Sequence, residues 1–270
     1  MKRALFTVLG GLLLALLPIR SIAQDYSSGK GLRAALKDKE AKVRTRAAEQ
    51  LDGYDLKADP EMIAAVVDAL KDVDEDVRRL AADALGKLRD TKEAKSYVPM
   101  LLEVASKDKS YKVRERAVNS LASFEGAAKG AVPGLIKALG DTDPDFRAGV
   151  VGALSQIDSG NKDVVQTFVA RLKDADWHVR LHAVTGLHFA RRNGADNKVI
   201  IRAMMKALND EHPNVRGQAA DELGYAGTAA VLAVPILEKM KKEDGDRIVR
   251  REAEEAIRRI RKAMEEQTTQ

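Results

Sequence analysis

The chain has no cysteine among its 270 residues. It therefore has no disulfide framework, no thiol nucleophile and no thiolate ligand for a metal. Aromatic residues make up only 4% of the chain, and no segment alternates polar and apolar residues with a period of two. Because β-strands favour aromatic and β-branched residues in that alternation, we expect no strands and an all-α fold.

The excess of positive charge is also small. The chain has 46 basic and 41 acidic residues, and residues 1–23 contain three of the basic residues and no acidic one. Without that segment, 43 basic and 41 acidic residues remain, which is a net charge of +2. Nucleic-acid-binding proteins concentrate much more positive charge on one face, so we expect no nucleic-acid partner.

Residues 1–23 differ in composition from the rest of the chain. Lys2 and Arg3 precede a run of about 16 apolar residues, and small residues stand at Ser21 and Ala23. This pattern is typical of a secretory signal peptide cleaved after Ala23. The alternative is a membrane anchor, but the run is shorter than the roughly 20 residues that span a bilayer. We therefore expect export to the periplasm or the extracellular space, without stable membrane insertion after cleavage.

An Asp and an Arg six residues apart recur throughout the remaining sequence, at intervals of 33 to 36 residues. A small Ala or a Val stands three residues after each Arg, and Leu or Ile stands seven residues after it, which places one apolar face on a helix. A second apolar stretch precedes each Asp, so each unit has two helices. The seven pairs are Asp38 and Arg44, Asp72 and Arg78, Asp108 and Arg114, Asp141 and Arg147, Asp174 and Arg180, Asp210 and Arg216, and Asp244 and Arg250.

This arrangement of residues 30–262 resembles the HEAT repeat family, particularly its bacterial branch named after phycobilisome lyases. The resemblance implies a right-handed α-solenoid of about seven HEAT-like two-helix repeats. It also implies that the Asp and Arg residues form a structural ladder of hydrogen bonds from repeat to repeat. We divide the chain into the signal peptide (1–23), a short linker (24–29), the solenoid (30–264) and a polar tail (265–270).

The resemblance is specific for the fold and says little about function. The alternative that the resemblance implies is a HEAT-like repeat enzyme, either an oxidoreductase of the deoxyhypusine hydroxylase type, whose His-Glu dipeptides hold two irons, or a bilin lyase. This sequence has no His-Glu dipeptide, and HEAT-like DNA glycosylases are disfavoured by its charge and expected export. We expect a monomeric, non-enzymatic scaffold that needs no cofactor and binds an unidentified protein or peptide on its concave surface. An accessory module of an envelope complex remains a third possibility.

The segment LKDADWHVRLHAV, residues 172–184, carries side chains that the other repeats lack. His178 and His182 are one helical turn apart, and His212 stands in the turn of the next repeat. These three histidines are weak candidates for a metal site, and we expect no bound metal because no carboxylate partner accompanies each of them.

A second distinctive feature is a nearly uncharged strip in repeats 4–6. The exposed positions two, five and nine residues after each ladder Arg are mostly charged in repeats 1–3 and 7. In repeats 4–6 they include two aromatic residues and little charge, which is typical of a recognition surface. Alternatively, Phe189 and Tyr225 turn inward, and Gly149 and Gly152 permit close helix contact. The predicted partner-binding residues are Trp177, His182, Thr185, Phe189, Gln218 and Tyr225.

Overall fold

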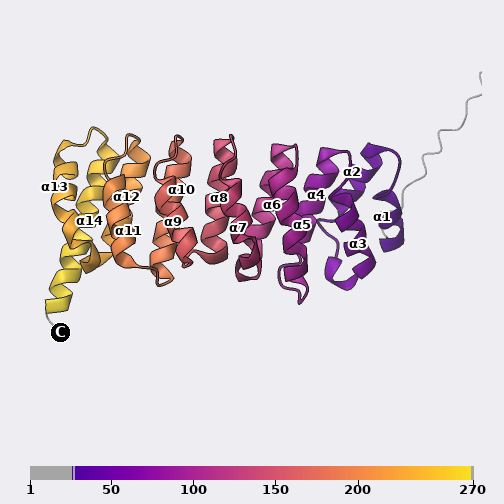
Figure 1. The fold of residues 1–270 in the computed structure, drawn as a ribbon, viewed down its shortest axis with the longest axis horizontal. Helices are drawn as coiled ribbons and strands as arrows, with labels where there is room; N and C mark the ends of the chain where they lie inside the picture. Colours follow the sequence, from indigo (N-terminus) through magenta and orange to yellow (C-terminus); the bar gives the residue numbers. More distant parts are fainter. Residues whose placement is uncertain (1–25, 27, 269–270) are drawn as a thin grey trace, which may run out of the picture.

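The computed structural model describes residue 26 and residues 28–268, and the signal peptide expected over residues 1–23 lies outside this part of the chain. The described residues form fourteen α-helices and three short 3-10 helices, with no strand among them. Figure 1 shows the helices following one another in an elongated array from α1 to α14. The expected all-α solenoid is confirmed.

The fourteen helices form seven pairs. The first helices of the pairs are α1 (Gly29–Ala35), α3 (Pro60–Ala69), α5 (Ala94–Lys107), α7 (Val132–Ala138), α9 (Lys162–Arg171), α11 (Asn197–Ala207) and α13 (Val234–Glu243). The second helices are α2 (Ala41–Gln50), α4 (Glu75–Gly86), α6 (Tyr111–Ser123), α8 (Pro144–Asp158), α10 (Trp177–Arg192), α12 (Pro213–Tyr225) and α14 (Arg247–Thr268). The 3-10 helices, which precede α3, α7 and α13, are η1 (Leu56–Ala58), η2 (Glu125–Ala131) and η3 (Gly227–Ala233).

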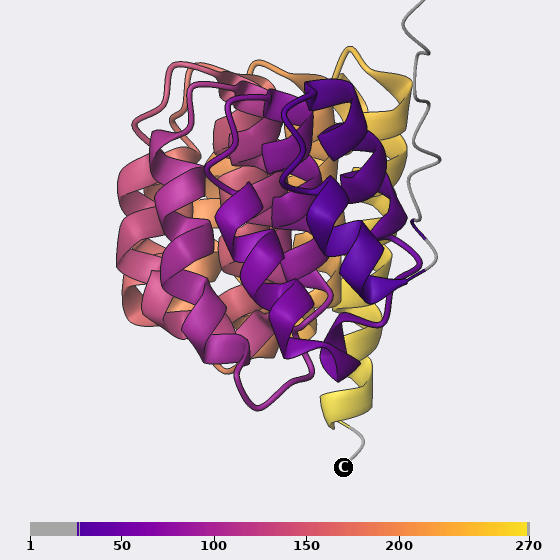
Figure 2. The same cartoon turned by 90° about the vertical axis from the view of Figure 1, so that its right-hand side faces the viewer.

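The two rows of helices pack differently along the array. Each second helix packs closely against the second helix of the next repeat, whereas neighbouring first helices touch much less. Because the second helices pack more closely than the first helices, the array curves, and the second helices lie on the inner side of the curve. Figure 2 shows the rows end-on, one behind another along the length of the molecule. We call the exposed surface of α2, α4, α6, α8, α10, α12 and α14 the second-helix face.

Local sequence explains where the second helices begin. Asp74 and Asp176 precede α4 and α10 and cap them: Asp74 accepts hydrogen bonds from the N–H groups of Asp76 and Val77, and Asp176 accepts one from the N–H of His178. Pro144 and Pro213 occupy the first position of α8 and α12, where a missing N–H costs nothing. The recurring Val, Ala and Leu positions are buried between repeats and form one continuous core.

Glycine permits close approach between helices in this core, as Gly186 and Gly224 illustrate. A Cβ atom added at Gly186 would lie 3.0 Å from the ring of Phe168, and one added at Gly224 would lie 2.8 Å from the Cα atom of Ala256. The second contact brings α12 and α14 together, and a side chain at Gly224 would force the two helices apart.

The C-terminal end differs from the expected boundary. The solenoid was expected to end at residue 264 and to be followed by a polar tail, but α14 continues to Thr268. Arg261 pairs with Glu238 of α13 at 2.7 Å, and Lys262 pairs with Glu266, one turn further along α14, at 3.7 Å. No helix in the described part of the chain is long and apolar enough to cross a bilayer.

Candidate functional site

The ladder of Asp and Arg side chains connects neighbouring repeats. Arg180 donates from Nη1 to the main-chain carbonyl of Asp174, in its own repeat, at 2.9 Å. Its Nε and Nη2 donate to the two carboxylate oxygens of Asp210, in the next repeat, at 2.8 and 2.9 Å. The Asp of the same repeat thus offers its main-chain carbonyl to the Arg. The ion pair between the Arg and Asp side chains joins two neighbouring repeats. Such bidentate, charge-assisted pairs are strong and hold a defined geometry.

The ladder also shifts the acidity of its carboxyl groups. Burial by itself would raise the pKa of Asp174. The hydrogen bonds from Arg147 and from the N–H of Asp176 outweigh burial, so the pKa lies below its usual value. The same balance lowers the pKa of Asp72 and of Asp108. These carboxylates therefore stay ionised at neutral pH and keep their hydrogen bonds to the ladder arginines. Their role is structural.

One rung is weaker than the others. Arg114 reaches Asp141 through a single hydrogen bond of 3.2 Å, and its buried Nε atom has no hydrogen-bond partner. Its guanidinium lies 5.1 Å from the ring centre of Phe146, which replaces the Val found before the ladder Arg in the other repeats. The rung without a bidentate pair is thus the one whose guanidinium packs near an aromatic ring.

The aromatic residues of the predicted strip reach solvent on the second-helix face. Phe189 is 42% exposed and Tyr225 is 56% exposed. A Cβ atom added at Gly149 would meet no atom within 4 Å, and one added at Gly152 would meet only His182, at 3.7 Å. The alternative in which both rings turn inward and these glycines permit helix contact is therefore wrong.

The remaining strip residues lie around these rings. His182 is exposed and Thr185 is half-buried, and both lie on the face of α10 that carries Phe189. Gln218 is half-buried on α12, one turn before Glu222. The surrounding protein atoms lower the pKa of His182 by partial burial, and the neighbouring His178 lowers it further. The strip is thus a surface of rings, amides and an imidazole that is easily kept neutral.

A buried acid–base pair lies beneath the exposed rings. The Nδ1 atom of His188 contacts Oε2 of Glu222, and Gln218 donates a hydrogen bond of 2.8 Å to Oε1 of the same carboxylate. Burial raises the pKa of Glu222, although His188 and Gln218 act in the opposite direction. The imidazole also makes edge-on contacts with the rings of Phe189 and Tyr225, so the pair supports both.

Helix α14 also contacts the ring of Tyr225, in addition to His188. The guanidinium of Arg259 lies 4.3 Å from the centre of the Tyr225 ring. The same Arg259 donates a hydrogen bond of 2.5 Å to Asp221, one turn before Tyr225 on α12. These contacts hold the ring in place, and Tyr225 is nevertheless 56% exposed.

The three candidate metal ligands do not converge on one point. The ring of Trp177 stacks on His212 at 3.9 Å and packs against His178 at 3.6 Å. The Nδ1 atom of His178 lies 3.3 Å from Asp176, which caps α10. Trp177 is half-buried in this stack, at the turn end of the repeats rather than beside Phe189. Within residues 26 and 28–268, no group of three or more His, Asp or Glu side chains has the arrangement of a metal site.

Comparison with known proteins identifies the family. The sequence profile of HEAT repeats matches residues 29–97, 98–188 and 165–258. The chain belongs to the HEAT repeat family. None of the curated proteins compared with the chain matches it.

Several solved structures share the HEAT repeat architecture. The archaeal HEAT-like repeats protein of Thermococcus onnurineus superposes with a TM-score of 0.58 at 16% identity, covering 87% of this chain and 98% of that one. The CpcE and CpcF complex of the Nostoc phycocyanin lyase gives 0.50 at 21% identity, covering 96% and 100%. Importin beta gives 0.62 at 16% identity, covering 87% of this chain and 35% of that one. At these identities the likeness shows the fold alone.

Comparison of the repeats shows how one of three important residues could have been found from the sequence. Glu222 stands six residues after its ladder Arg, where five of the other six repeats have Ala, Ser or Gly. An acid at a position of small residues is a signal of an unusual contact between repeats. His188 and Arg259 give no such signal, because their contacts with Tyr225 depend on how closely α10, α12 and α14 pack.

Proposed function

We propose that this HEAT repeat chain is a non-enzymatic scaffold that binds a protein or peptide on the second-helix face and acts after export, in the periplasm or the extracellular space. Stacked helix pairs provide a long continuous surface, which suits the binding of an extended partner. The signal-like composition of residues 1–23 supports export. Importin beta and the other structural neighbours support the fold from which the proposal starts.

The observation that carries the proposal is the exposure of Phe189 and Tyr225 on adjacent second helices. Large aromatic rings are costly to leave in water, and interfaces are enriched in them. Here neighbouring groups hold both rings in place: His188 lies against them, and Arg259 lies over Tyr225. Rigid, exposed rings lose little conformational freedom when a partner covers them, which favours binding.

The proposal is tested by capture of a partner with matched variants. Phe189→Ala combined with Tyr225→Ala should weaken capture from the cell-envelope fraction by at least about tenfold, the loss typical of two interface aromatics. Val199→Ala serves as the control, because Val199 is similarly exposed, at 41%, but lies on the first helix α11. Helicity and melting temperature should be unchanged in both proteins, since the replaced side chains are exposed.

Two results would contradict the proposal. Equal capture by the double variant and the native protein would show that the partner binds elsewhere. Stoichiometric iron or zinc in the purified native protein would instead favour an enzyme of the hydroxylase type, in which metal ions carry the chemistry.

A further inference from the structure

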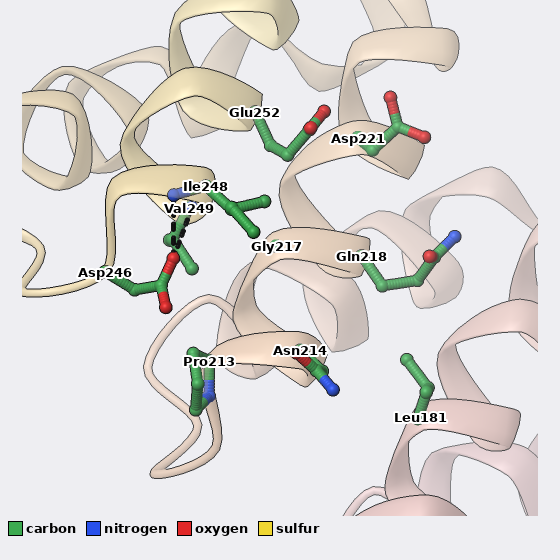
Figure 3. Close-up of a pocket in the computed structure, with 10 residues that line it drawn as sticks. All are labelled: Leu181, Pro213, Asn214, Gly217, Gln218, Asp221, Asp246, Ile248, Val249 and Glu252. Atoms are coloured by element: carbon green, nitrogen blue, oxygen red, sulfur yellow. Dashed lines mark hydrogen bonds between the residues drawn. The ribbon is translucent and has the colours of Figure 1, made fainter.

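A groove on the second-helix face lies between α12 and α14, beside the exposed aromatic residues. It has a volume of about 370 Å³ and is lined by residues of α10, α12 and α14 and of the turn before α14. Figure 3 shows Gly217 on the wall of α12, opposite Ile248 and Val249. A Cβ atom added at Gly217 would lie 3.8 Å from Val249, so the glycine leaves the groove open without being required by packing.

The floor of the groove is apolar where other repeats are polar. Ile248 is 60% exposed, and Leu181, Pro213 and Val249 also line the groove. Ile248 stands two residues before its ladder Arg, and it is the one apolar residue at that position. The other six repeats have Lys42, Asp76, Lys112, Asp145, His178 and Asn214 there.

The rim of the groove is acidic. Asp221, Asp246 and Glu252 line it, and no basic residue does. Asp246 uses Oδ1 to accept hydrogen bonds from the N–H groups of Ile248 and Val249. Figure 3 shows the carboxylates of Asp221 and Glu252 on the same side of the groove.

Two arginines outside the groove already contact this rim. Arg259 bonds to Asp221, and Arg251 bonds to Glu252 at 2.7 Å. The side chain of Arg251 is 67% exposed. An exposed ion pair such as Arg251 with Glu252 contributes little free energy. A cation from a partner can therefore share Glu252 with Arg251 or replace Arg251 there.

We propose that this groove takes a lysine or arginine side chain of the bound peptide, next to an apolar residue that packs on Phe189 and Tyr225. The aliphatic part of such a side chain would lie along the apolar floor, and its charged end would reach the carboxylates. An anion is disfavoured by the same carboxylates. Asp221 and Tyr225 lie one turn apart on α12, so both subsites can contact one short segment. This inference rests on the proposed function and specifies the chemistry of the partner.

The experiment uses a phage-displayed library of random peptides, selected on the full chain. We expect the selected peptides to carry Lys or Arg beside an apolar residue. A synthetic copy of the strongest one is then measured by fluorescence anisotropy. The variant Asp246→Asn with Glu252→Gln should bind it about tenfold more weakly, as expected for two exposed charge contacts. Asn also caps helices, so α14 should stay intact, and its melting curve checks this.

Glu49→Gln is the matched control, because Glu49 is exposed on the second helix α2, in the register of Asp221. It should bind like the native protein, and added salt should weaken native binding. Selected peptides without basic residues would overturn the groove proposal, as would native affinity in the groove variant. If Phe189→Ala with Tyr225→Ala then still abolished binding, the proposed function would stand without the groove. A library that gave no binder would count against both.

Discussion

Glu222 places a carboxyl group between two repeats, at a position that most of the array keeps small. It is 5% exposed and contacts His188 and Gln218. A buried ionisable pair usually stabilises a fold no more than apolar packing of the same volume would. Stability therefore does not explain why this pair stands here, directly beneath Phe189 and Tyr225. Its position supports the proposal that this part of the second-helix face is used for binding.

The raised pKa of Glu222 predicts a pH-dependent effect of Glu222→Gln. Because the folded-state pKa lies above the unfolded one, the native protein loses stability as the pH rises through the folded value. Gln has the same size, can still accept a hydrogen bond from Gln218 and cannot ionise. The melting temperature of the variant relative to the native protein should therefore be higher at about pH 8 than at about pH 4.

The control for this measurement is Glu49→Gln, which removes an exposed carboxyl group. Melting curves followed by circular dichroism give the comparison for both proteins. A difference for Glu222→Gln that stays constant between the two pH values would show that burial does not govern this carboxyl group.

At the scale of the helices, the ladder is the element that sequence reasoning describes best. The Asp and Arg spacing recurs seven times along the sequence and so indicates seven helix pairs. The spacing does not indicate which Arg bonds to each carboxylate. Arg180 bonds to Asp210 of the next repeat, and this pairing depends on how the repeats stack. The length of α14 was missed for a related reason, since its last turn is polar and is supported by charge pairs rather than by an apolar pattern.

An interior rung and the last rung of the ladder offer a test of its energy. Arg180→Ala should lower the free energy of unfolding by about 1–3 kcal/mol, because the buried carboxylate of Asp210 loses its bidentate partner. Arg250→Ala should cost less, because among the described residues the guanidinium of Arg250 donates hydrogen bonds only to the carbonyls of Asp244 and Gly245. Denaturant unfolding of both variants measures the difference. Equal losses would mean that the carboxylate contacts add nothing beyond the carbonyl contacts.

For the whole molecule, the sequence predicts the array but not the shape of its surface. Seven repeats, their order and their helical content follow from periodic residues. The strip around Phe189 was predicted from its lack of charge, whereas its exposure depends on the packing of α10 against α12. The groove beside Ile248 was missed, because it requires the distance between α12 and α14 and the missing side chain of Gly217. Features formed by one helix are readable in the sequence, and features formed between helices are not.

The proposed export of the chain leads to a prediction about its mature form. The basic pair Lys2 and Arg3, the apolar run and the small residues at Ser21 and Ala23 predict cleavage after Ala23. When the full chain is expressed in a bacterium, intact mass and N-terminal sequencing of the periplasmic or secreted protein should therefore show a chain that begins at Gln24. Ala23→Arg should block cleavage, because signal peptidases accept small residues there, and Ala23→Gly should leave it unchanged. A native protein that retained Met1 to Ala23 in the soluble cytoplasmic fraction would contradict export, and the search for a partner would then move to that compartment.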